Sequence, residues 1–304
     1  MTVGNSDPSS VPVHLKFSPS RLSTEDSCPQ KAHYTYSRGL DPGSSKPTPA
    51  LLRGLIIHRY MDLWHGQGIK PVDAFSILKE EFPTYEGQIL TPVGLVYMQR
   101  YVATHQDDLK RYRVVGAEKR FIIPFTTPHG HEVFLDGIID LIVEDLLNRN
   151  AIEIWDHKTD SRNIWSGDVV SFDRQLNQYA VIAYLLDYDP TRITVNQIKT
   201  SLTKIESIGK APKEELFHRH SAPITPSSVE AWMRNIGKRI DQILEAEYVH
   251  KNLGAHCIFC PYRQACQMEL NGVDPEPYLR SNFGKRDDSD LTLILDIEDG
   301  VFDA

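Results

Sequence analysis

Several features are scarce or absent in this sequence of 304 residues. No apolar run approaches the length that spans a bilayer, and the first residues lack the basic start and apolar core of a signal peptide. We therefore expect a cytoplasmic protein with no membrane contact. A Walker-type phosphate loop and internal repeats are also absent, which argues against an ATP-driven motor.

Basic charge is not in excess, since the formal net charge is −8. Passive nucleic-acid binders are usually basic, so this balance argues mildly against that class. Much of the negative charge is local, because residues 285–304 hold seven acidic and two basic residues. The rest of the chain is closer to neutral and leaves room for a basic groove. We expect this acidic tail to be a solvated extension, a docking segment for a protein partner, or a mimic of DNA in the groove.

The pattern of apolar residues predicts an α/β fold in one domain over residues 15–284, after a disordered, Ser- and Pro-rich segment at 1–14. A helical part is expected at about 50–113, a sheet-containing core at about 114–202, and a C-terminal helix with a cysteine segment at about 225–270. Strands are expected at 114–123, 133–143, 151–158 and 192–202. Helices are expected at 50–64, 72–82, 92–112, 172–187 and 225–248.

Two helix starts have clear capping signals. Ser18 is a candidate N-cap with Pro19 at the first helical position, and this short helix is expected to close at Cys28. Thr225 and Pro226 repeat the arrangement at the start of the last long helix.

The stretch 134–159 organises the chain, because it predicts a β-hairpin with acidic residues in otherwise apolar strands. Period-2 alternation places Asp156 and Lys158 on one face of the second strand, and pairing of the hairpin brings Asp140 across from them. Two buried carboxylates beside an ammonium are costly unless they hold a metal or do chemistry. A divalent cation on Asp140 and Asp156, with Lys158 acting on a water, is the equipment for metal-assisted phosphodiester hydrolysis. The triplet alone is equally typical of a structural ion pair.

The four cysteines predict a second metal site. Cys257, Cys260 and Cys266 cluster near the C-terminus, and Cys28 is the remaining thiol that could complete four ligands. One site built from all four would tie the N-terminal segment to the C-terminal one. Three clustered cysteines with a distant fourth favour a 4Fe–4S cluster. Structural zinc, with His256 as a possible ligand, is one alternative. The other is that the four cysteines are buried free thiols that bind no metal.

With these residues in place, the chain resembles the PD-(D/E)XK nucleases of the RecB-like group, and among them the iron–sulfur exonucleases of the AddB and CRISPR-adaptation type. The resemblance covers about residues 17–267 and implies a restriction-endonuclease-like core, with a mixed central sheet flanked by helices. Its motifs are Ser18-Pro19-Ser20-Arg21-Leu22 with Cys28-Pro29, Gly54 to His58, Gly137 to Asp140, Asp156 to Thr159, Gln175 to Tyr179, and the terminal cysteine triad Cys257, Cys260 and Cys266.

The resemblance implies a role for each matched position. Asp140 and Asp156 would bind Mg²⁺ or Mn²⁺ together with the backbone carbonyl of His157, where the family usually has an aromatic or apolar residue. His58 would add a nitrogen ligand, which tilts the preference toward Mn²⁺. Lys158 would position the attacking water and stabilise charge on the phosphate. Gln175 and Tyr179 would orient the lysine and touch the DNA strand.

The resemblance therefore implies a metal-dependent DNA exonuclease that acts on single-stranded DNA or duplex ends and carries a structural 4Fe–4S cluster. Two alternatives stay open. One is a non-catalytic protein that binds DNA ends within a repair, recombination or CRISPR-adaptation complex. The other is a structure-specific endonuclease on the same fold. Glu118 and Asp136 lie near the site in sequence and are assigned only the role of strand-end charge.

Overall fold

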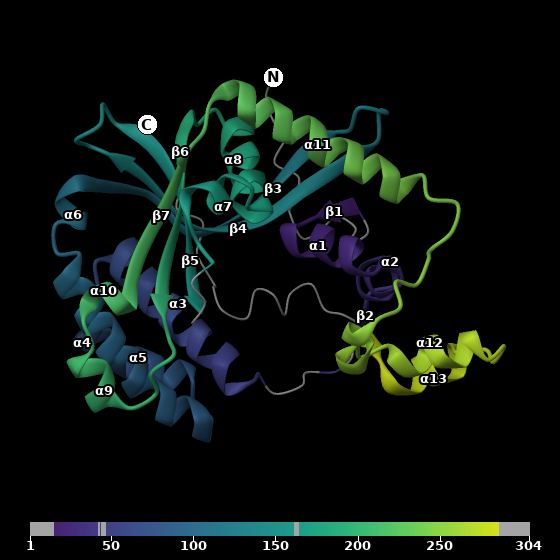
Figure 1. Ribbon diagram of the computed structural model, residues 1–304, viewed down its shortest axis with the longest axis horizontal. Helices are drawn as coiled ribbons and strands as arrows, with labels where there is room; N and C mark the ends of the chain where they lie inside the picture. The colour runs from purple at the N-terminus through teal and green to yellow at the C-terminus, as the bar shows by residue number, and fades with distance from the viewer. Residues whose placement is uncertain (1–14, 42, 44–46, 161–163, 286–304) are drawn as a thin grey trace. The chain divides into compact units, whose positions relative to one another are not determined.

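The computed structural model describes residues 15–41, 43, 47–160 and 164–285 (Figure 1). The chain divides into two compact units. Unit 1 comprises the described residues within 1–45, 124–135 and 240–304, and unit 2 those within 46–123 and 136–239. Each unit is built from segments that are far apart in the sequence.

The sheet has the strand order β1-β4-β5-β6-β7, with β3 pairing on β4. The strands are β1 (Lys16–Phe17), β3 (Tyr112–Thr126), β4 (Glu132–Asp145), β5 (Ala151–Asp160), β6 (Pro190–Lys199) and β7 (Phe217–Pro223). β4 and β5 form the expected antiparallel hairpin, β5 and β6 run parallel, and β6 and β7 are antiparallel. The sheet is therefore mixed, as the fold class required.

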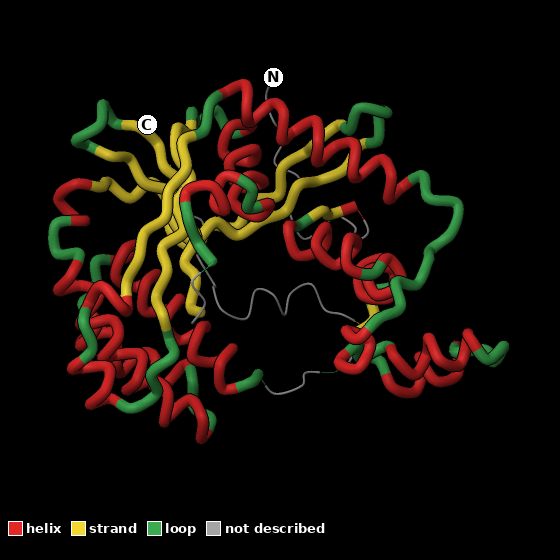
Figure 2. Tube along the Cα trace, in the orientation of Figure 1, coloured by secondary structure: helices red, strands yellow, loops and turns green. Residues whose placement is uncertain are grey.

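Helices cover both faces of the strands of unit 2 (Figure 2). The helices are α3 (Pro49–Gln67), α4 (Pro71–Glu81), α5 (Tyr85–Thr104), α6 (Asp108–Arg111), α7 (Gly167–Ser171), α8 (Arg174–Leu185), α9 (Ile205–Lys210), α10 (Lys213–Leu216) and α11 (Pro226–Leu244), of which α11 continues into unit 1. Successive side chains of β5 point to opposite faces of the sheet and therefore meet different helices. Lys158 points to α8, whereas Trp155 and Thr159 point to α3.

An apolar core fills the space between α3, α4, α5 and the sheet. Tyr60, Met61, Tyr97 and Met98 are fully buried in it. Gly94 lets α3 and α5 approach closely, because a Cβ at this position would lie 2.8 Å from Ile56 Cγ2. Burial of this apolar face, at about 25 cal/mol per Å², holds α3 in place and with it the residues that α3 carries.

Unit 1 contains the remaining elements. They are α1 (Pro19–Ser27), α2 (Pro29–Ala32), a π-helical turn at His33–Ser37, β2 (Leu40–Asp41), a 3₁₀ turn at Ala255–Phe259, α12 (Arg263–Leu270), α13 (Glu276–Asn282) and β8 (Gly284–Lys285). β2 pairs antiparallel with β8, and β1 pairs parallel with the start of β4. Tyr34 and Tyr262 pack together at the centre of a small core.

Several expectations from the sequence are confirmed. Ser18 accepts a hydrogen bond from Arg21 N at 3.2 Å, with Pro19 opening α1 and Cys28 closing it. At the start of α11, Thr225 Oγ1 accepts from Ser228 N at 3.2 Å and Ser228 Oγ accepts from Thr225 N at 2.9 Å, a reciprocal capping box.

Two expectations differ from the structure. The third long helix does not begin at Pro92, because α5 starts at Tyr85 with Thr84 as its N-cap, and Pro92 lies inside the helix. Strand β7 was not expected, since its seven residues include two histidines, an arginine and a serine and show little apolar alternation. Its pairing with β6 supplies the backbone hydrogen bonds that its composition does not predict.

The expectations for residues 1–14 and for most of the acidic tail lie outside the described residues. The expected single domain over 15–284 stays a prediction. Within the described ranges, none of the helices combines the length and the apolarity needed to cross a membrane.

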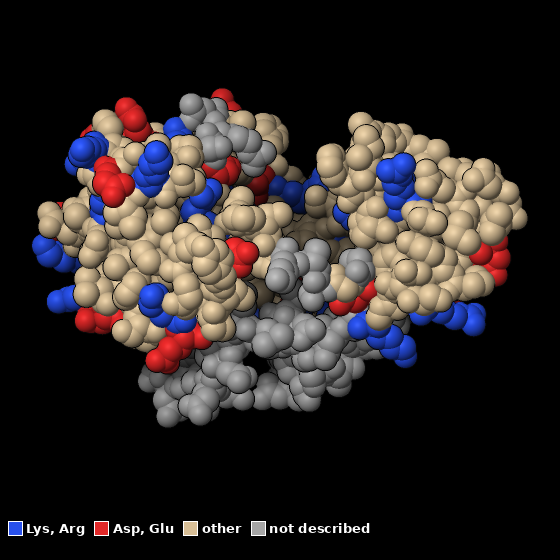
Figure 3. Space-filling model, turned by 90° about the horizontal axis from the view of Figure 1, so that it is seen from below, with Lys and Arg blue, Asp and Glu red and all other residues tan. Residues whose placement is uncertain are grey.

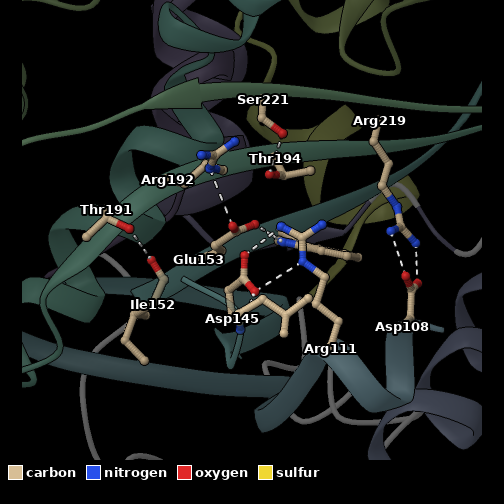
Figure 4. Close-up of polar contacts among 12 residues, drawn as sticks. Asp108, Arg111, Asp145, Ile152, Glu153, Thr191, Arg192, Thr194, Arg219 and Ser221 are labelled. Carbon is tan, nitrogen blue, oxygen red and sulfur yellow. Dashed lines mark hydrogen bonds and ion pairs between the residues drawn. The ribbon is translucent and has the colours of Figure 1, made fainter. Parts of the chain in front are cut away.

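A buried ion pair joins α6 to β7 (Figure 4). Arg219 donates to both carboxylate oxygens of Asp108, and its Nη1 lies 2.9 Å from Oδ1. Its Nη2 also donates to Tyr101 Oη at 2.7 Å, and its guanidinium carbon lies 4.5 Å from the centre of the Trp155 ring. Both side chains are mostly buried, so each charge is stabilised mainly by the opposite charge of its partner.

Asp108→Ala is expected to lower the free energy of unfolding by about 3 kcal/mol, because it leaves the Arg219 charge buried without its carboxylate. Chemical denaturation would measure the loss. Lys110→Ala is the control, since its partner Asp107 is 76% exposed, and it should leave the stability unchanged. Equal effects of the two substitutions would contradict a dominant role for the buried pair.

Candidate active site

The strands of the β4–β5 hairpin stop pairing at the acidic residues. The regular register ends at Leu141 opposite Trp155, one residue before Asp140 and Asp156. Beyond that point the side chain of Asp140 accepts the hydrogen bond in place of the backbone. His157 N donates to Asp140 Oδ2 at 2.6 Å. Asp140 is 8% exposed and Asp156 is 1% exposed, so the two acids meet in a site with little water.

Lys158 lies beside these acids and is held from α8. Its Nζ lies 2.6 Å from Asp156 Oδ2 and donates to Gln175 Oε1 at 2.8 Å. Gln175 Nε2 in turn donates to Tyr179 Oη at 2.8 Å. Gln175 and Tyr179 are one helical turn apart, so a single face of α8 fixes the position of the ammonium.

His58 and Glu118 complete the cluster. His58 Nδ1 lies 3.7 Å from Asp140 Oδ2 and 3.7 Å from Glu118 Oε1, distances too long for hydrogen bonds. The ligand atoms of His58, Glu118 and Asp140 all lie within 4.8 Å of one another. By contrast, Asp136 forms a two-pronged pair with Arg120, at 3.1 and 3.0 Å.

Glu118 is the residue that the sequence did not single out. Its φ is +46°, in the left-handed region that costs a non-glycine residue about 1–2 kcal/mol. Its Oε1 is buried and has no hydrogen-bond partner among the described residues. The sequence signal is a lone acid in a strand rich in basic and apolar residues, which does not reveal the backbone turn that aims this side chain.

Two glycines allow the elements of the site to approach closely. A Cβ at Gly54 would lie 2.8 Å from Thr159 Oγ1, which would push α3 away from β5. A Cβ at Gly137 would lie 2.8 Å from Tyr179 Cε1, which would push α8 away from β4. Gly54 therefore brings His58 to the acids, and Gly137 brings Tyr179 and Gln175 to the lysine.

The charges of the site perturb one another. Burial raises the pKa of Asp140 to about 6, and repulsion from Glu118 adds to this shift. Burial also raises the pKa of Asp156 to about 7, and repulsion from Asp140 adds to it. Burial would lower the pKa of His58, but Asp140 and Glu118 outweigh it and raise this pKa to about 9. For Lys158, too, the carboxylates outweigh burial and raise the pKa. The site therefore attracts positive charge.

The imidazole of His157 points away from the acids into a buried polar network. Asn196 Nδ2 lies 3.0 Å from His157 Nδ1 and donates to Tyr101 Oη at 2.8 Å. The rings of His157 and His65 are stacked with centres 5.8 Å apart. Burial lowers the pKa of His157 well below its usual range, so the ring is neutral. The side chain thus anchors the strand and leaves its backbone for the site.

The donor set fits a divalent metal ion. Oxygen ligands suit Mg²⁺ and Mn²⁺, and one imidazole nitrogen favours Mn²⁺. The buried Glu118 Oε1 without a partner is the observation that a bound cation would account for. Asp140, Glu118 and His58 are close enough to share one ion, with Asp156 next to them.

The four cysteines lie around a separate cavity of about 230 Å³ in unit 1. Cys266 lies in the first turn of α12, while Cys257 lies in the preceding 3₁₀ turn and Cys260 closes it. Cys28, 8% exposed, reaches the cavity from the end of α1. Burial raises the pKa of Cys266 to about 11, but Lys31, Lys251 and Arg263 also line the cavity and could balance thiolate charge.

Other contacts join the same two segments of unit 1. Arg38 forms a two-pronged pair with Glu276 at 2.6 and 2.9 Å, and Tyr34 Oη donates to Glu269 Oε1 at 2.6 Å. His256 also lines the cysteine cavity. These contacts hold the N-terminal segment against the C-terminal one, and a tie through a metal bound by all four cysteines stays a prediction.

The mixed sheet, the flanking helices and the cluster of acids with a lysine define a class of metal-dependent nucleases. A sequence model of the PD-(D/E)XK nuclease superfamily matches residues 16–267. The chain belongs to the PD-(D/E)XK nuclease superfamily.

Other comparisons add little. No curated protein matches the chain. A solved structure titled "Crystal structure of SSO0001" matches with a TM-score of 0.37 and 8% identity, over 82% of this chain and 84% of that chain. Nothing about function follows from so distant a likeness.

Mn²⁺ is expected to raise the melting temperature more at about pH 8 than at about pH 5.5. Asp140 and Asp156 have raised pKa values in the folded chain, so they bind protons more tightly when folded than when unfolded. Their contribution to stability is present at low pH and is lost as the pH rises through these pKa values. A metal must displace the same protons, so its stabilising effect grows with pH.

Differential scanning fluorimetry with and without Mn²⁺ checks this expectation. Glu118→Gln should reduce the metal-dependent increase, whereas Glu80→Gln, at an exposed position on α4, should preserve it. A metal-dependent increase that is the same at both pH values would contradict the placement of the ion on these acids.

Proposed function

We propose that this protein is a metal-dependent DNA exonuclease that hydrolyses phosphodiester bonds of single-stranded DNA or of duplex ends. The single observation that supports it most is the meeting of Asp140, Asp156 and Lys158 at the point where the β4–β5 ladder ends. Restriction of the activity to DNA ends is carried by the resemblance to the RecB-like exonucleases.

The residues of the site would divide the work. Asp140, Asp156, His58 and the backbone carbonyl of His157 would hold Mg²⁺ or Mn²⁺, and Glu118 joins them as a ligand. When bound, the ion supplies Lewis-acid activation of the phosphate and of a water nucleophile.

The protein's own groups would align the substrate and stabilise charge. Lys158 would place its ammonium against the developing negative charge of the phosphate, in a site where little water screens it. Gln175 accepts a hydrogen bond from this ammonium and would keep it aimed at the reacting phosphate. Tyr179 would hold Gln175 and contact the DNA strand.

The charges on the face in Figure 3 favour binding through the site over binding through a broad basic surface on that face. On the face in Figure 3, Lys and Arg side chains of the described residues are scattered among Asp and Glu. A bound metal ion and Lys158 would therefore supply much of the attraction for the phosphate at the cleavage position.

Two other functions remain testable alternatives. A non-catalytic DNA-end-binding protein has no need for a lysine held at 2.8 Å by a glutamine, which disfavours that alternative. A structure-specific endonuclease could use the same site on an internal phosphate. A protein partner bound through the acidic tail, and a cytoplasmic location, stay predictions.

Degradation of end-labelled linear single-stranded DNA is expected in Mn²⁺ or Mg²⁺, with none in EDTA. Lys158→Met should lower the rate by at least about 100-fold, because it removes charge stabilisation in a site of low dielectric. Asp156→Asn should abolish the activity, since it removes a metal ligand. Lys204→Met, at an exposed lysine, is the control and should retain full activity.

A circular single-stranded substrate of the same sequence distinguishes the alternatives. Resistance of the circle supports an exonuclease, and its cleavage would establish an endonuclease instead. DNA binding without cleavage in any metal would overturn the enzyme and leave the end-binding protein.

The cysteine cavity is the second part of the proposal. Cys28, Cys257, Cys260 and Cys266 would hold a 4Fe–4S cluster with a structural role, since four thiols from distant segments surround one cavity lined by three cations. The cluster would hold the N-terminal segment to α12. Structural zinc, with His256 as a further ligand, is the competing occupant.

Anaerobically purified protein is expected to contain about four iron and four sulfide per chain. Cys266→Ala should lose the brown colour and lower the melting temperature, whereas Cys266→Ser, a weaker ligand of nearly the same size, should retain part of both. Zinc in place of iron and sulfide, dependent on the same cysteines, would identify the cavity as a zinc site.

A further inference from the structure

A further cluster of metal-ligating side chains lies in unit 1, apart from the active site and from the cysteine cavity. It joins the loop between β3 and β4 to the end of α11 (Figure 1). The loop supplies His129 and His131, and the helix end supplies Asp241 and Glu245. We propose that these four residues form a binding site for a divalent transition metal of the zinc class.

The loop presents its histidines from a rigid turn. Thr127 N donates to His131 O at 3.0 Å, and His131 N donates to Thr127 Oγ1 at 3.1 Å, which closes the turn at its base. Gly130 adopts a φ of +89°, in the left-handed region that glycine tolerates best. The histidines are separated by this one residue and both reach the helix end.

The helix supplies its carboxylates with matching spacing. Asp241 and Glu245 are one helical turn apart, and Glu245 N still donates to Asp241 O at 2.9 Å, so both side chains lie on one face. His129 Nδ1 and His131 Nε2 lie 2.8 and 3.0 Å from Glu245 Oε1. His129 Nδ1 also lies 4.0 Å from Asp241 Oδ2.

These distances are near those around a tetrahedral metal ion. Ligands at about 2.0–2.2 Å from tetrahedral zinc are about 3.3–3.6 Å from one another. The ligand atoms of His129, Asp241 and Glu245 all lie within 4.8 Å of one another. The distances of 2.8 Å and 4.0 Å from His129 Nδ1 to the two carboxylates are shorter and longer than the tetrahedral spacing. His131 is half-exposed and can rotate to become the fourth ligand.

The burial of Asp241 is what distinguishes this cluster from an ordinary surface ion pair. Asp241 is 1% exposed, and its Oδ2 accepts from the backbone N of His129 at 3.2 Å. Its Oδ1 is buried and has no hydrogen-bond partner in the described part of the chain. The contacts of His129 reach only Oδ2 of this carboxylate, and a bound dication would give the buried Oδ1 a partner.

The donor set selects the class of metal. Two imidazoles with two carboxylates suit Zn²⁺ and its first-row neighbours better than Mg²⁺ or Ca²⁺, which prefer oxygen ligands alone. Four protein ligands leave no open position, so the role is structural. The ion would clip together two segments that are 112 residues apart in the sequence.

Titration of the chelated, refolded full-length protein with Zn²⁺, followed by calorimetry and by metal analysis, tests the proposal. We expect about one Zn²⁺ per chain that depends on these residues. Asp241→Asn, which keeps the acceptor for His129 N, and Glu245→Gln, at a half-exposed position that cannot disrupt a core, should each weaken this binding at least about 10-fold. His250→Gln, at an exposed histidine, is the control.

Variants of the other two sites assign the zinc. Ion bound by the cysteines would be lost in Cys266→Ala and kept in Asp241→Asn, and ion bound by the active site would be lost in Asp140→Asn. Co²⁺ substitution should give the absorption of a tetrahedral site in the wild type and in Cys266→Ala. Zinc affinity and cobalt spectrum unchanged in both Asp241→Asn and Glu245→Gln would overturn the proposal.

Discussion

The active site of this protein depends on the burial of two carboxylates at the end of a β-hairpin. Asp140 and Asp156 are almost without water, and a buried carboxylate is costly unless nearby groups compensate it. The chain compensates them with the N–H of His157, the ammonium of Lys158 and the imidazole of His58. The first two groups come from β5 and the third from α3, so the positions of β5 and α3 follow from the same requirement.

The two faces of β5 serve different purposes. One face carries Asp156 and Lys158 into the site, where Gln175 of α8 restrains the lysine. The other face carries His157 into a neutral network with Asn196 and Tyr101, against the buried pair of Arg219 and Asp108. Because these contacts fix the imidazole on the face of β5 opposite the acids, they also fix the backbone of residue 157 at the site. Asn196 gives the His157 imidazole a polar partner at this buried position.

Three clusters of ligand-type side chains have different relations to the fold. The active-site cluster lies within unit 2 and draws on α3, on β3 and on the β4–β5 hairpin. The cysteine cavity and the cluster of His129, Asp241 and Glu245 lie within unit 1 and join segments far apart in the sequence. Unit 1 contains a small apolar cluster around Tyr34 and Tyr262, and bound ions would add to the contacts that hold its separate segments together.

The sequence by itself determined the hairpin, its acids and its lysine, because an acid in an apolar strand and a period-2 repeat are visible without coordinates. It also determined the two capped helix starts and the cysteine cluster. It did not reveal Glu118, whose side chain is aimed by a positive φ, or strand β7, whose composition is not that of a strand. Nor did it reveal the pairing of Arg219 with Asp108 or of His129 with Glu245, since these residues meet only after the sheet and helices have packed. The pattern of apolar residues along the chain shows which side chains are buried and whether a segment is a helix or a strand. Contacts between distant segments depend on how these elements pack, so only the tertiary structure determined them.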